Sequence, residues 1–357
     1  MNHVLPGEPG GDCTWFERQN AFEQREIRRQ VAFRRRHWPD LPNGAWSKRP
    51  DYLYPHILPT GKERLAFYPP LADAILSYLE YEDIVLHSEA LNLKSSQVAC
   101  LNVLFPLRTD LTLTTAVFRT LIPDLSVVTG IEFEYTGPSG TTAWLGEPSR
   151  GKRGQNRTSI DAAIFWQDTT GHRNISLIEW KYTEHNFGVC SAFTDATRAE
   201  RMRCLSLGIC TASHPEQICL LTDGGDSRSR RYWEHLVGAG IRKEAFAGVK
   251  GCPFAGPLYQ LMRQQLLSSY LRDVGEADEV DIMVVAFSGN TALMELPPAL
   301  ETMRLSESDT VIKVWNQALT GVPLVRHFFV ETLLSALDSI VSADARWRAF
   351  LRDRYGV

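Results

Sequence analysis

The chain has 357 residues, of which 44% are hydrophobic, and a formal net charge of −4. A chain of this kind can bury a large core, so we expect one elaborated domain or one domain with appendages. No apolar run reaches the ~18 residues of a membrane-spanning helix, and the N-terminus lacks the basic-then-apolar layout of a signal peptide. We therefore expect a cytoplasmic protein that makes no contact with a membrane.

The cysteines are odd in number and irregularly spaced, which argues against the disulfide framework of a secreted protein. They are Cys13, Cys100, Cys190, Cys204, Cys210, Cys219 and Cys252. Most are expected to be buried thiols. Five of them fall between positions 190 and 252 and could instead gather around zinc or an iron–sulfur cluster, although no Cys-x-x-Cys pair supports this alternative.

The N-terminal third predicts an appendage followed by helices. Residues 14–36 predict a helix with one apolar face, and residues 38–70, rich in Pro, Gly and Tyr, are expected to follow the surface irregularly. Further helices are predicted over residues 71–80, 95–105 and 111–121. Ser95 and Ser96 can cap the second of these, and Pro106 is expected to end it.

The middle of the chain predicts a sheet. A first strand over residues 127–135 is followed by a polar loop over 136–157, and two strand-like runs, 158–166 and 175–182, then form a loose hairpin. Two more strands are predicted over residues 217–222 and 281–287, and more helices over 192–207, 257–271, 323–338 and 343–355. This order predicts an α/β or α+β domain with a mixed central β-sheet flanked by helices. Gly-rich phosphate-binding loops are absent, so nothing supports a nucleotide-binding Rossmann or P-loop domain.

Three charged residues stand inside the two strand-like runs. Glu179 and Lys181 share a strand face because alternate side chains point the same way, and Asp161 on the neighbouring strand can come level with them. Both acids have apolar neighbours, where a charge is costly unless it is paired or binds a metal. Carboxylate oxygens suit magnesium or manganese. The alternative is a sheet-edge salt bridge between Lys181 and one of the acids.

The basic residues are mostly arginines, and they occur in three clusters, of which two are expected to be solvated faces. The third cluster comes directly before Asp161, so it predicts a basic loop that opens onto the site and grips a polyanion. Its members, the expected nucleic-acid-binding residues, are Arg150, Lys152, Arg153 and Arg157.

An acid on the second strand and acid-x-Lys on the third resemble the PD-(D/E)xK nuclease superfamily, whose fold is the restriction-endonuclease-like core. The resemblance covers roughly residues 95–290 and is closest to RecB-type domains and to a group of prokaryotic restriction endonucleases. It implies three parts: an N-terminal helical and irregular appendage over residues 1–90, a nuclease-like core over 91–290, and a C-terminal helical extension over 291–357.

Carried over residue by residue, the resemblance implies that Asp161 and Glu179 bind Mg²⁺ or Mn²⁺ with the carbonyl of Trp180. Lys181 would orient the attacking water. Glu134, at the end of the first strand, is where such domains often carry an additional metal-binding acid, and an exposed strand-end charge is the alternative.

The helix over residues 257–271 carries the last implied site residue. Gln260 corresponds to the Gln of the RecB-type helix motif, which touches the site or the substrate. Two positions depart from the family pattern: Ile160 stands where proline is common, and Gln264 stands where a Tyr usually follows.

These observations predict a metal-dependent nuclease that hydrolyses phosphodiester bonds, with DNA as the expected substrate. Endonuclease and exonuclease action both fit, as do restriction, antiviral (phage) defence and repair. The expected partner is nucleic acid, and a homodimer or a partner subunit of a defence system is compatible with the sequence. The main alternative is a catalytically inactive nuclease fold that binds nucleic acid or assembles with other subunits, and a metal-cluster protein built on the 190–252 cysteines is a third.

Overall fold

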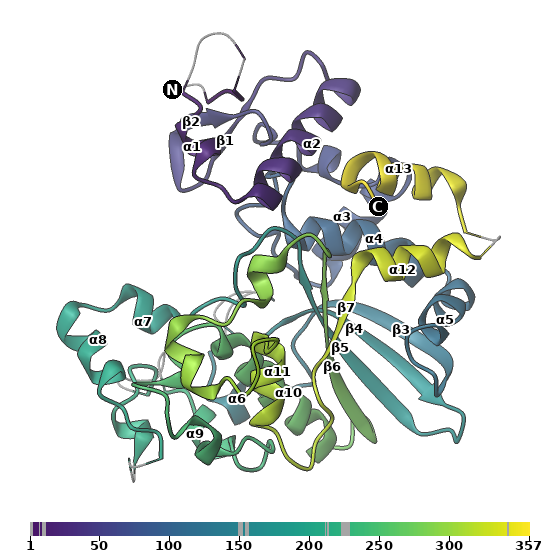
Figure 1. Ribbon diagram of the computed structural model, residues 1–357. Helices are drawn as coiled ribbons and strands as arrows, with labels where there is room; N and C mark the ends of the chain where they lie inside the picture. The colour runs from purple at the N-terminus through teal and green to yellow at the C-terminus, as the bar shows by residue number, and fades with distance from the viewer. Residues whose placement is uncertain are drawn as a thin grey trace.

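A five-stranded mixed β-sheet lies at the centre of the computed structural model, which describes residues 3–6, 8, 12–148, 153, 157–210, 212, 214–222, 229–340 and 343–357 (Figure 1). The strands are β3 (Leu125–Tyr135), β4 (Ile160–Asp168), β5 (Arg173–Lys181), β6 (Glu279–Ala286) and β7 (Arg326–Phe329), in that spatial order. β3, β4 and β5 pair antiparallel, whereas β5–β6 and β6–β7 pair parallel. The predicted mixed α/β fold is thereby confirmed.

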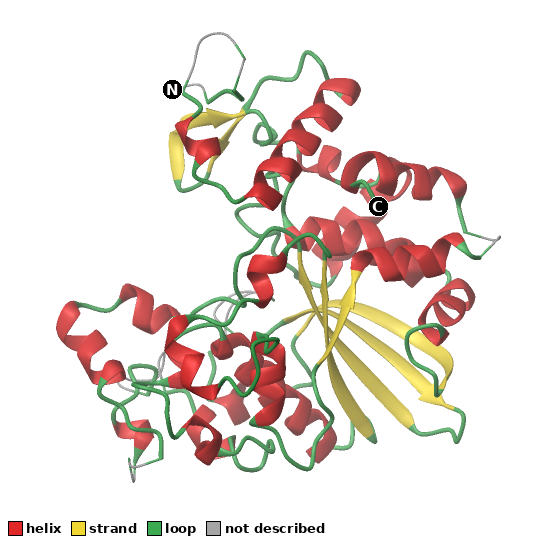
Figure 2. Cartoon of the chain, in the orientation of Figure 1, coloured by secondary structure: helices red, strands yellow, loops and turns green. Residues whose placement is uncertain are grey.

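Helices cover both faces of this sheet, one group on each side (Figure 2). The first face packs on α2 (Ala21–His37), α3 (Ala72–Tyr81), α4 (Ser96–Thr109), α5 (Leu111–Arg119), α12 (Val330–Asp338) and α13 (Ala345–Tyr355). The second face packs on α6 (Thr141–Leu145), α9 (Tyr232–His235), α10 (Leu258–Asp273) and α11 (Val311–Gln317). No helix in the described part of the chain is long and apolar enough to cross a membrane.

Strand alternation decides which way the charged residues of β5 point. Ile178 and Trp180 pack in the core of the first face, and Ile175 and Leu177 pack in the core of the second. Because side chains alternate along a strand, the odd-numbered acid and lysine that follow Leu177 face the second group of helices, where α10 lies. The register of the sheet therefore aims the predicted site at α10.

Pro106 does not end α4, contrary to the sequence prediction. The helix continues to Thr109, although Pro106 has no N–H to donate to the carbonyl of Asn102. That carbonyl accepts a hydrogen bond from the indole Nε1 of Trp347 at 2.9 Å, so the acceptor freed by the proline is satisfied by α13. A partner distant in the sequence thus makes the interior proline tolerable.

Other predicted elements also differ in the structure. Residues 217–222 form no strand: they follow the 3₁₀ turn η3 (Pro215–Gln217) in local turns, with the Cys219 N–H donating to the Pro215 carbonyl. Residues 323–338 are not one helix, because their first part forms β7 beside β6. The predicted helix over 14–36 is two helices, α1 (Thr14–Glu17) and α2, since Asn20 caps α2 by accepting the Glu23 N–H at 2.8 Å.

The predicted helix over residues 192–207 is also divided in two, α7 (Ser191–Asp195) and α8 (Arg198–Leu205). Thr197 begins α8 with a capping box to Glu200. Within the predicted irregular stretch 38–70, β1 (Gly44–Trp46) and β2 (Arg49–Tyr54) form a small antiparallel hairpin.

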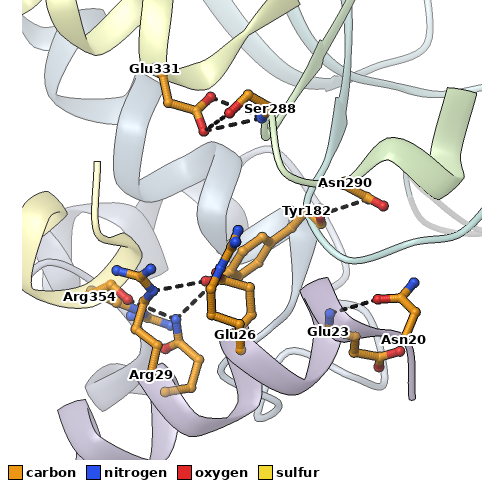
Figure 3. Close-up of polar contacts among 11 residues, drawn as sticks. Asn20, Glu23, Glu26, Arg29, Tyr182, Ser288, Asn290, Glu331 and Arg354 are labelled. Carbon is orange, nitrogen blue, oxygen red and sulfur yellow. Dashed lines mark hydrogen bonds and ion pairs between the residues drawn. The ribbon is translucent and has the colours of Figure 1, made fainter. Parts of the chain in front are cut away.

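Both ends of the chain are tied to the end of β5 through Tyr182 (Figure 3). Its hydroxyl donates to Glu26 Oε2 at 2.9 Å and accepts from Gln30 Nε2 at 2.9 Å, and Gln30 also donates to the carbonyl of Arg354. Asn290 Nδ2 donates to the Tyr182 carbonyl at 3.0 Å. Because β7 also belongs to the sheet, residues after position 290 contribute a strand to it.

Candidate active site

The predicted site lies where β4 and β5 separate. Ala162 pairs with Ile178, and beyond this pair the carboxylate of Asp161 accepts the backbone N–H of Trp180 at 2.7 Å. Asp161 thus links the two strands with its side chain. Glu179 and Lys181 are 2% and 8% exposed, so the structure brings the three predicted residues together in a largely buried position.

Glu179 has a hydrogen-bond partner on each carboxylate oxygen. Oε1 lies 2.6 Å from Lys181 Nζ and accepts from Gln260 Nε2 at 2.5 Å, and Oε2 accepts from Gln264 Nε2. The two glutamines are four residues apart on α10 and therefore share one face of the helix. Gln260 Oε1 also accepts from Lys181 Nζ at 3.0 Å. The salt bridge considered as the alternative is present, as part of a larger polar cluster.

Glu134, at the end of β3, faces the same site. Its backbone lies in the left-handed region, with φ of 47°, which is costly for a residue with a side chain. Its carboxylate accepts from Gln97 Nε2 at 2.8 Å and from Ser159 Oγ at 2.5 Å. Glu134 is therefore held towards the site and is not the exposed strand-end charge considered as the alternative.

Burial and mutual repulsion act on the acids. The pKa of Asp161 is raised well above its ordinary value by burial and by the charges of Glu179 and Glu134, against the opposing effect of Lys181 and the Trp180 N–H. Burial and the charge of Glu179 also raise the pKa of Glu134, although its hydrogen bonds oppose the shift. The acids therefore favour any added positive charge between them.

Lys181 remains an ammonium group. Burial lowers its pKa, but the attraction of Glu179, Glu184 and Asp161 outweighs burial, so its pKa is raised above the ordinary value. The side chain can therefore donate hydrogen bonds near neutral pH and does not accept a proton there.

A polar cavity of about 720 Å³ opens onto this cluster. Besides the acids and Lys181, its wall includes Lys94, Arg157, Ser159, Arg263 and Gln264. Of the predicted nucleic-acid-binding residues, Arg157 thus lines the cavity, whereas Arg153 pairs with Glu82 at 3.3 Å outside the cavity wall. Arg150 and Lys152 lie outside the described residues.

Sequence reasoning did not assign several residues of this wall. Gln264 had a local signal, because it follows Gln260 by one helical turn. Ser159 had one as well, since it lies two residues before Asp161. Arg263 had one too, because it follows Gln260 by three residues on α10, and its Nε donates to Thr158 Oγ1 at 3.0 Å. Gln97, by contrast, is brought in from α4 by the tertiary fold.

The donor set fits a hard divalent cation that keeps part of its water shell. Among described residues, no group of three His, Cys, Asp or Glu side chains is placed to hold a metal ion, and Glu134 and Glu179 already accept hydrogen bonds from Gln97 and Gln264. Mg²⁺ is commonly held through only one or two carboxylates, with water and substrate oxygens as its other ligands. Asp161 and Glu179 can supply such a pair.

The sheet order and the acids and lysine at the β4–β5 separation define a restriction-endonuclease-like protein. A family model described as "Restriction Endonuclease associating with ARP" matches residues 40–356, and the chain belongs to this family. The family supports nuclease activity on nucleic acid as the coarse function. No curated protein and no solved structure matches the chain.

Proposed function

We propose that this protein is a metal-dependent nuclease that hydrolyses phosphodiester bonds of DNA at the Asp161 site. The observation that supports this most directly is the convergence of Asp161, Glu179 and Lys181 on one polar cavity in a member of a restriction endonuclease family. The cavity offers acids for a cation and basic groups for phosphate, which are the two requirements of the reaction.

Asp161 and Glu179 would hold Mg²⁺ or Mn²⁺, with Glu134 and the Trp180 carbonyl as further proposed ligands. The bound ion would supply Lewis-acid stabilisation of the charge that develops on the phosphate oxygens. Lys181, held by Glu179 and Gln260, would donate a hydrogen bond to the attacking water and favour its hydroxide form. Gln260 would thus act by positioning Lys181 and Glu179.

Substrate phosphates would be gripped by the basic loop before β4. Arg157 already lines the cavity, and Arg150, Lys152 and Arg153 are the further proposed contacts. Arginine suits this role because its planar fork can hold phosphate oxygens bidentately.

The family description names an association with ARP. We propose that this chain likewise acts with a partner of that kind, in the cytoplasm, in restriction or antiviral defence. A second copy of the chain is an alternative partner, because paired cuts in duplex DNA suit a two-fold dimer.

A second candidate function is a nucleic-acid-binding or assembly subunit without catalysis. The observation in its favour is that Glu179 already has a partner on both oxygens, as a retained structural ion pair would. Such a subunit would bind nucleic acid with a steep salt dependence and no metal requirement.

Cleavage assays separate the two candidates. The purified protein is incubated with linear duplex, single-stranded and circular DNA in Mg²⁺, Mn²⁺ or chelator, beside Asp161→Asn and the control Glu279→Gln, an exposed acid on neighbouring β6. We expect metal-dependent cleavage by the wild type and control and none by Asp161→Asn. A folded wild type that neither cleaves nor binds Mg²⁺ by calorimetry would favour the binding subunit.

A further inference from the structure

Arg263 is a basic residue of the polar cavity that the chemistry proposed above does not use. It lies on α10 three residues after Gln260, so the two side chains are neighbours on the helix surface. The Arg263 side chain is 21% exposed and lines the same cavity as Asp161 and Glu179. A guanidinium group is therefore present at the wall of the candidate active site, beside a glutamine that contacts Glu179.

Three neighbours hold the guanidinium group of Arg263. Its Nε donates to Thr158 Oγ1 at 3.0 Å, and its Nη2 lies 3.6 Å from Glu147 Oε1. Its Cζ lies 5.3 Å from the centre of the Tyr259 ring, within the range of a cation–π contact. Because the group is planar, contacts at Nε and Nη2 fix both its plane and its direction. Arg263 is thus oriented before any substrate binds.

Glu147, the acid that pairs with Arg263, is buried and already accepts several hydrogen bonds. Its carboxylate accepts from the Thr158 N–H at 2.7 Å, from Thr158 Oγ1 at 2.6 Å and from the Tyr232 hydroxyl at 2.6 Å. The nitrogen of Arg263, at 3.6 Å, is too distant for a hydrogen bond. Other donors therefore satisfy most of the charge of Glu147, and the charge of Arg263 stays largely available to a ligand.

Two other basic groups of the described cavity wall are more tightly paired. Lys94 forms an ion pair with Glu23, and Lys181 Nζ lies 2.6 Å from Glu179 Oε1. The two lysine side chains are only 8% and 10% exposed, respectively. Arg263 is more exposed and more loosely paired, so it is better placed than either lysine to meet the charge of a phosphate.

We propose that Arg263 binds a non-bridging oxygen of a substrate phosphate, and that Glu147 and Thr158 are positioning residues that orient it. The proposal rests on the nuclease function proposed above and adds a substrate contact to it. Contacts with described residues use Nε and Nη2, which leaves Nη1 to donate to the phosphate oxygen. A hydrogen bond between two charged groups is roughly twice as strong as a neutral one.

The fixed orientation of Arg263 favours catalysis as well as binding. Charge that develops on phosphate oxygens in a transition state is stabilised best by donors that need no rearrangement. Glu147 follows α6 and Tyr232 begins α9, and neither of these helices carries a proposed metal ligand. Arg263 is therefore oriented by a network separate from the one that holds Glu179.

The first test is the salt dependence of DNA binding, measured by fluorescence anisotropy with a labelled duplex. All proteins carry Asp161→Asn, so that binding is measured without cleavage. Each phosphate contact contributes about 0.9 to the slope of log K against log salt concentration. Adding Arg263→Gln should lower this slope by about one and weaken binding about tenfold at fixed salt. Arg272→Gln, the control, removes the same charge from the last turn of α10, outside the cavity wall, and should leave the slope unchanged.

A second variant separates phosphate binding from a purely structural role of Arg263. Arg263→Gln leaves Glu147 buried without its cation, which costs stability. Glu147→Gln/Arg263→Gln removes both charges and keeps the net charge of the chain, and it should lose the same unit of salt slope. If Arg263 were only the counter-ion of Glu147, this double variant would bind DNA as the Asp161→Asn protein does. That result would overturn the proposal.

Cleavage kinetics in Mg²⁺, without Asp161→Asn, test the positioning role. Thr158→Val removes the oxygen that accepts from Arg263 and keeps the N–H that donates to Glu147. We expect kcat to fall about tenfold while the salt slope of binding is kept. Arg263→Lys should also keep the slope and lose kcat, because an ammonium group lacks the planar fork.

The outcomes for Arg263 and for the nuclease function can be told apart. Wild-type kcat in both Thr158→Val and Arg263→Lys would overturn the positioning role. Equal salt slopes for Arg263→Gln and Arg272→Gln would overturn the phosphate contact. A wild type that binds DNA and does not cleave it would contradict the proposed nuclease function alone, because the comparison of salt slopes needs no catalysis.

Discussion

The folded protein disfavours the charged form of Asp161, and this predicts how a substitution of Asp161 changes the stability of the protein. The raised pKa of Asp161 means that the folded chain favours the protonated form. A carboxyl group whose folded-state pKa is raised contributes stability that is present at low pH. This contribution is lost as the pH rises through the folded-state pKa. At neutral pH without divalent cations, Asp161→Asn should therefore stabilise the protein by about 1 kcal/mol, while the amide oxygen still accepts the Trp180 N–H.

Denaturant unfolding in chelator measures this difference, which should shrink as the pH falls below ~3.9, where the acid of the wild type becomes protonated in the unfolded state as well as in the folded state. Saturating Mg²⁺ should reverse the order, because ligand at 100 times its Kd stabilises the wild type by about 2.7 kcal/mol. Equal stability of the two proteins at all pH values, with or without Mg²⁺, would contradict both the repulsion and the metal site.

Lys181 gives a second prediction at the residue scale. Lys181→Met leaves the buried carboxylate of Glu179 without its cation, so the free energy of unfolding should fall by about 3 kcal/mol. Adding Glu179→Gln should recover most of this loss, because Gln264 Oε1 is buried without a partner and can accept from the new amide. A double-mutant cycle measures the coupling; strictly additive losses would show that the pair is not coupled.

The central residues of the site could be read from the sequence because their placement depends on strand period alone. The two-residue repeat of a strand places Glu179 and Lys181 on one face, and a hairpin between the two strands is enough to place Asp161 beside them. The partners of Glu134 could not be found in this way, since Gln97 arrives from α4 through packing.

At the scale of elements, α4 and α13 depend on one another through Pro106. Trp347→Phe removes the donor to the buried carbonyl of Asn102, so we expect a loss of about 1–2 kcal/mol. Pro106→Ala in that background restores a backbone N–H at the position that normally bonds this carbonyl, and should recover part of the loss. Chemical denaturation of the four proteins measures this; a Pro106→Ala effect that is the same in both backgrounds would contradict the argument.

The elements that were predicted wrongly depend on distant contacts. Residues 217–222 contain an apolar run that periodicity cannot assign to a strand or to a buried turn. Residues 326–329 lack a helix because the exposed edge of β6 offers them hydrogen-bond partners. Pro106 was expected to end α4 because the indole that compensates for it lies on α13, far along the chain.

At the scale of the whole molecule, one sheet separates two cores, and both chain ends help to complete the first of them. The first core contains side chains from α2, α4, α12 and α13, so residues from the predicted N-terminal appendage and C-terminal extension pack directly on the sheet. The second core surrounds α10. The appended segments are therefore expected to be needed for the stability of the sheet on which the candidate active site lies.

The variant Tyr182→Phe, which removes a single oxygen atom, tests whether the stability of the sheet depends on the two chain ends. The variant loses the hydroxyl that joins Glu26 and Gln30 to the end of β5, and Gln30 in turn contacts Arg354. We expect a loss of about 2 kcal/mol, since a hydrogen bond to a buried charge is removed. Tyr81→Phe, the same change at a side chain that is 86% exposed, should have no measurable effect.

Hydrogen exchange would then show which parts loosen. Protection should fall together in α2 and α13, which meet at this tyrosine, and change little in α10, which lies in the other core. If α2 alone lost protection, the N-terminal segment would be an appendage, as the sequence predicted, and one that opens by itself. Loss in both helices would show that the two ends of the chain stabilise the sheet as one cooperative unit.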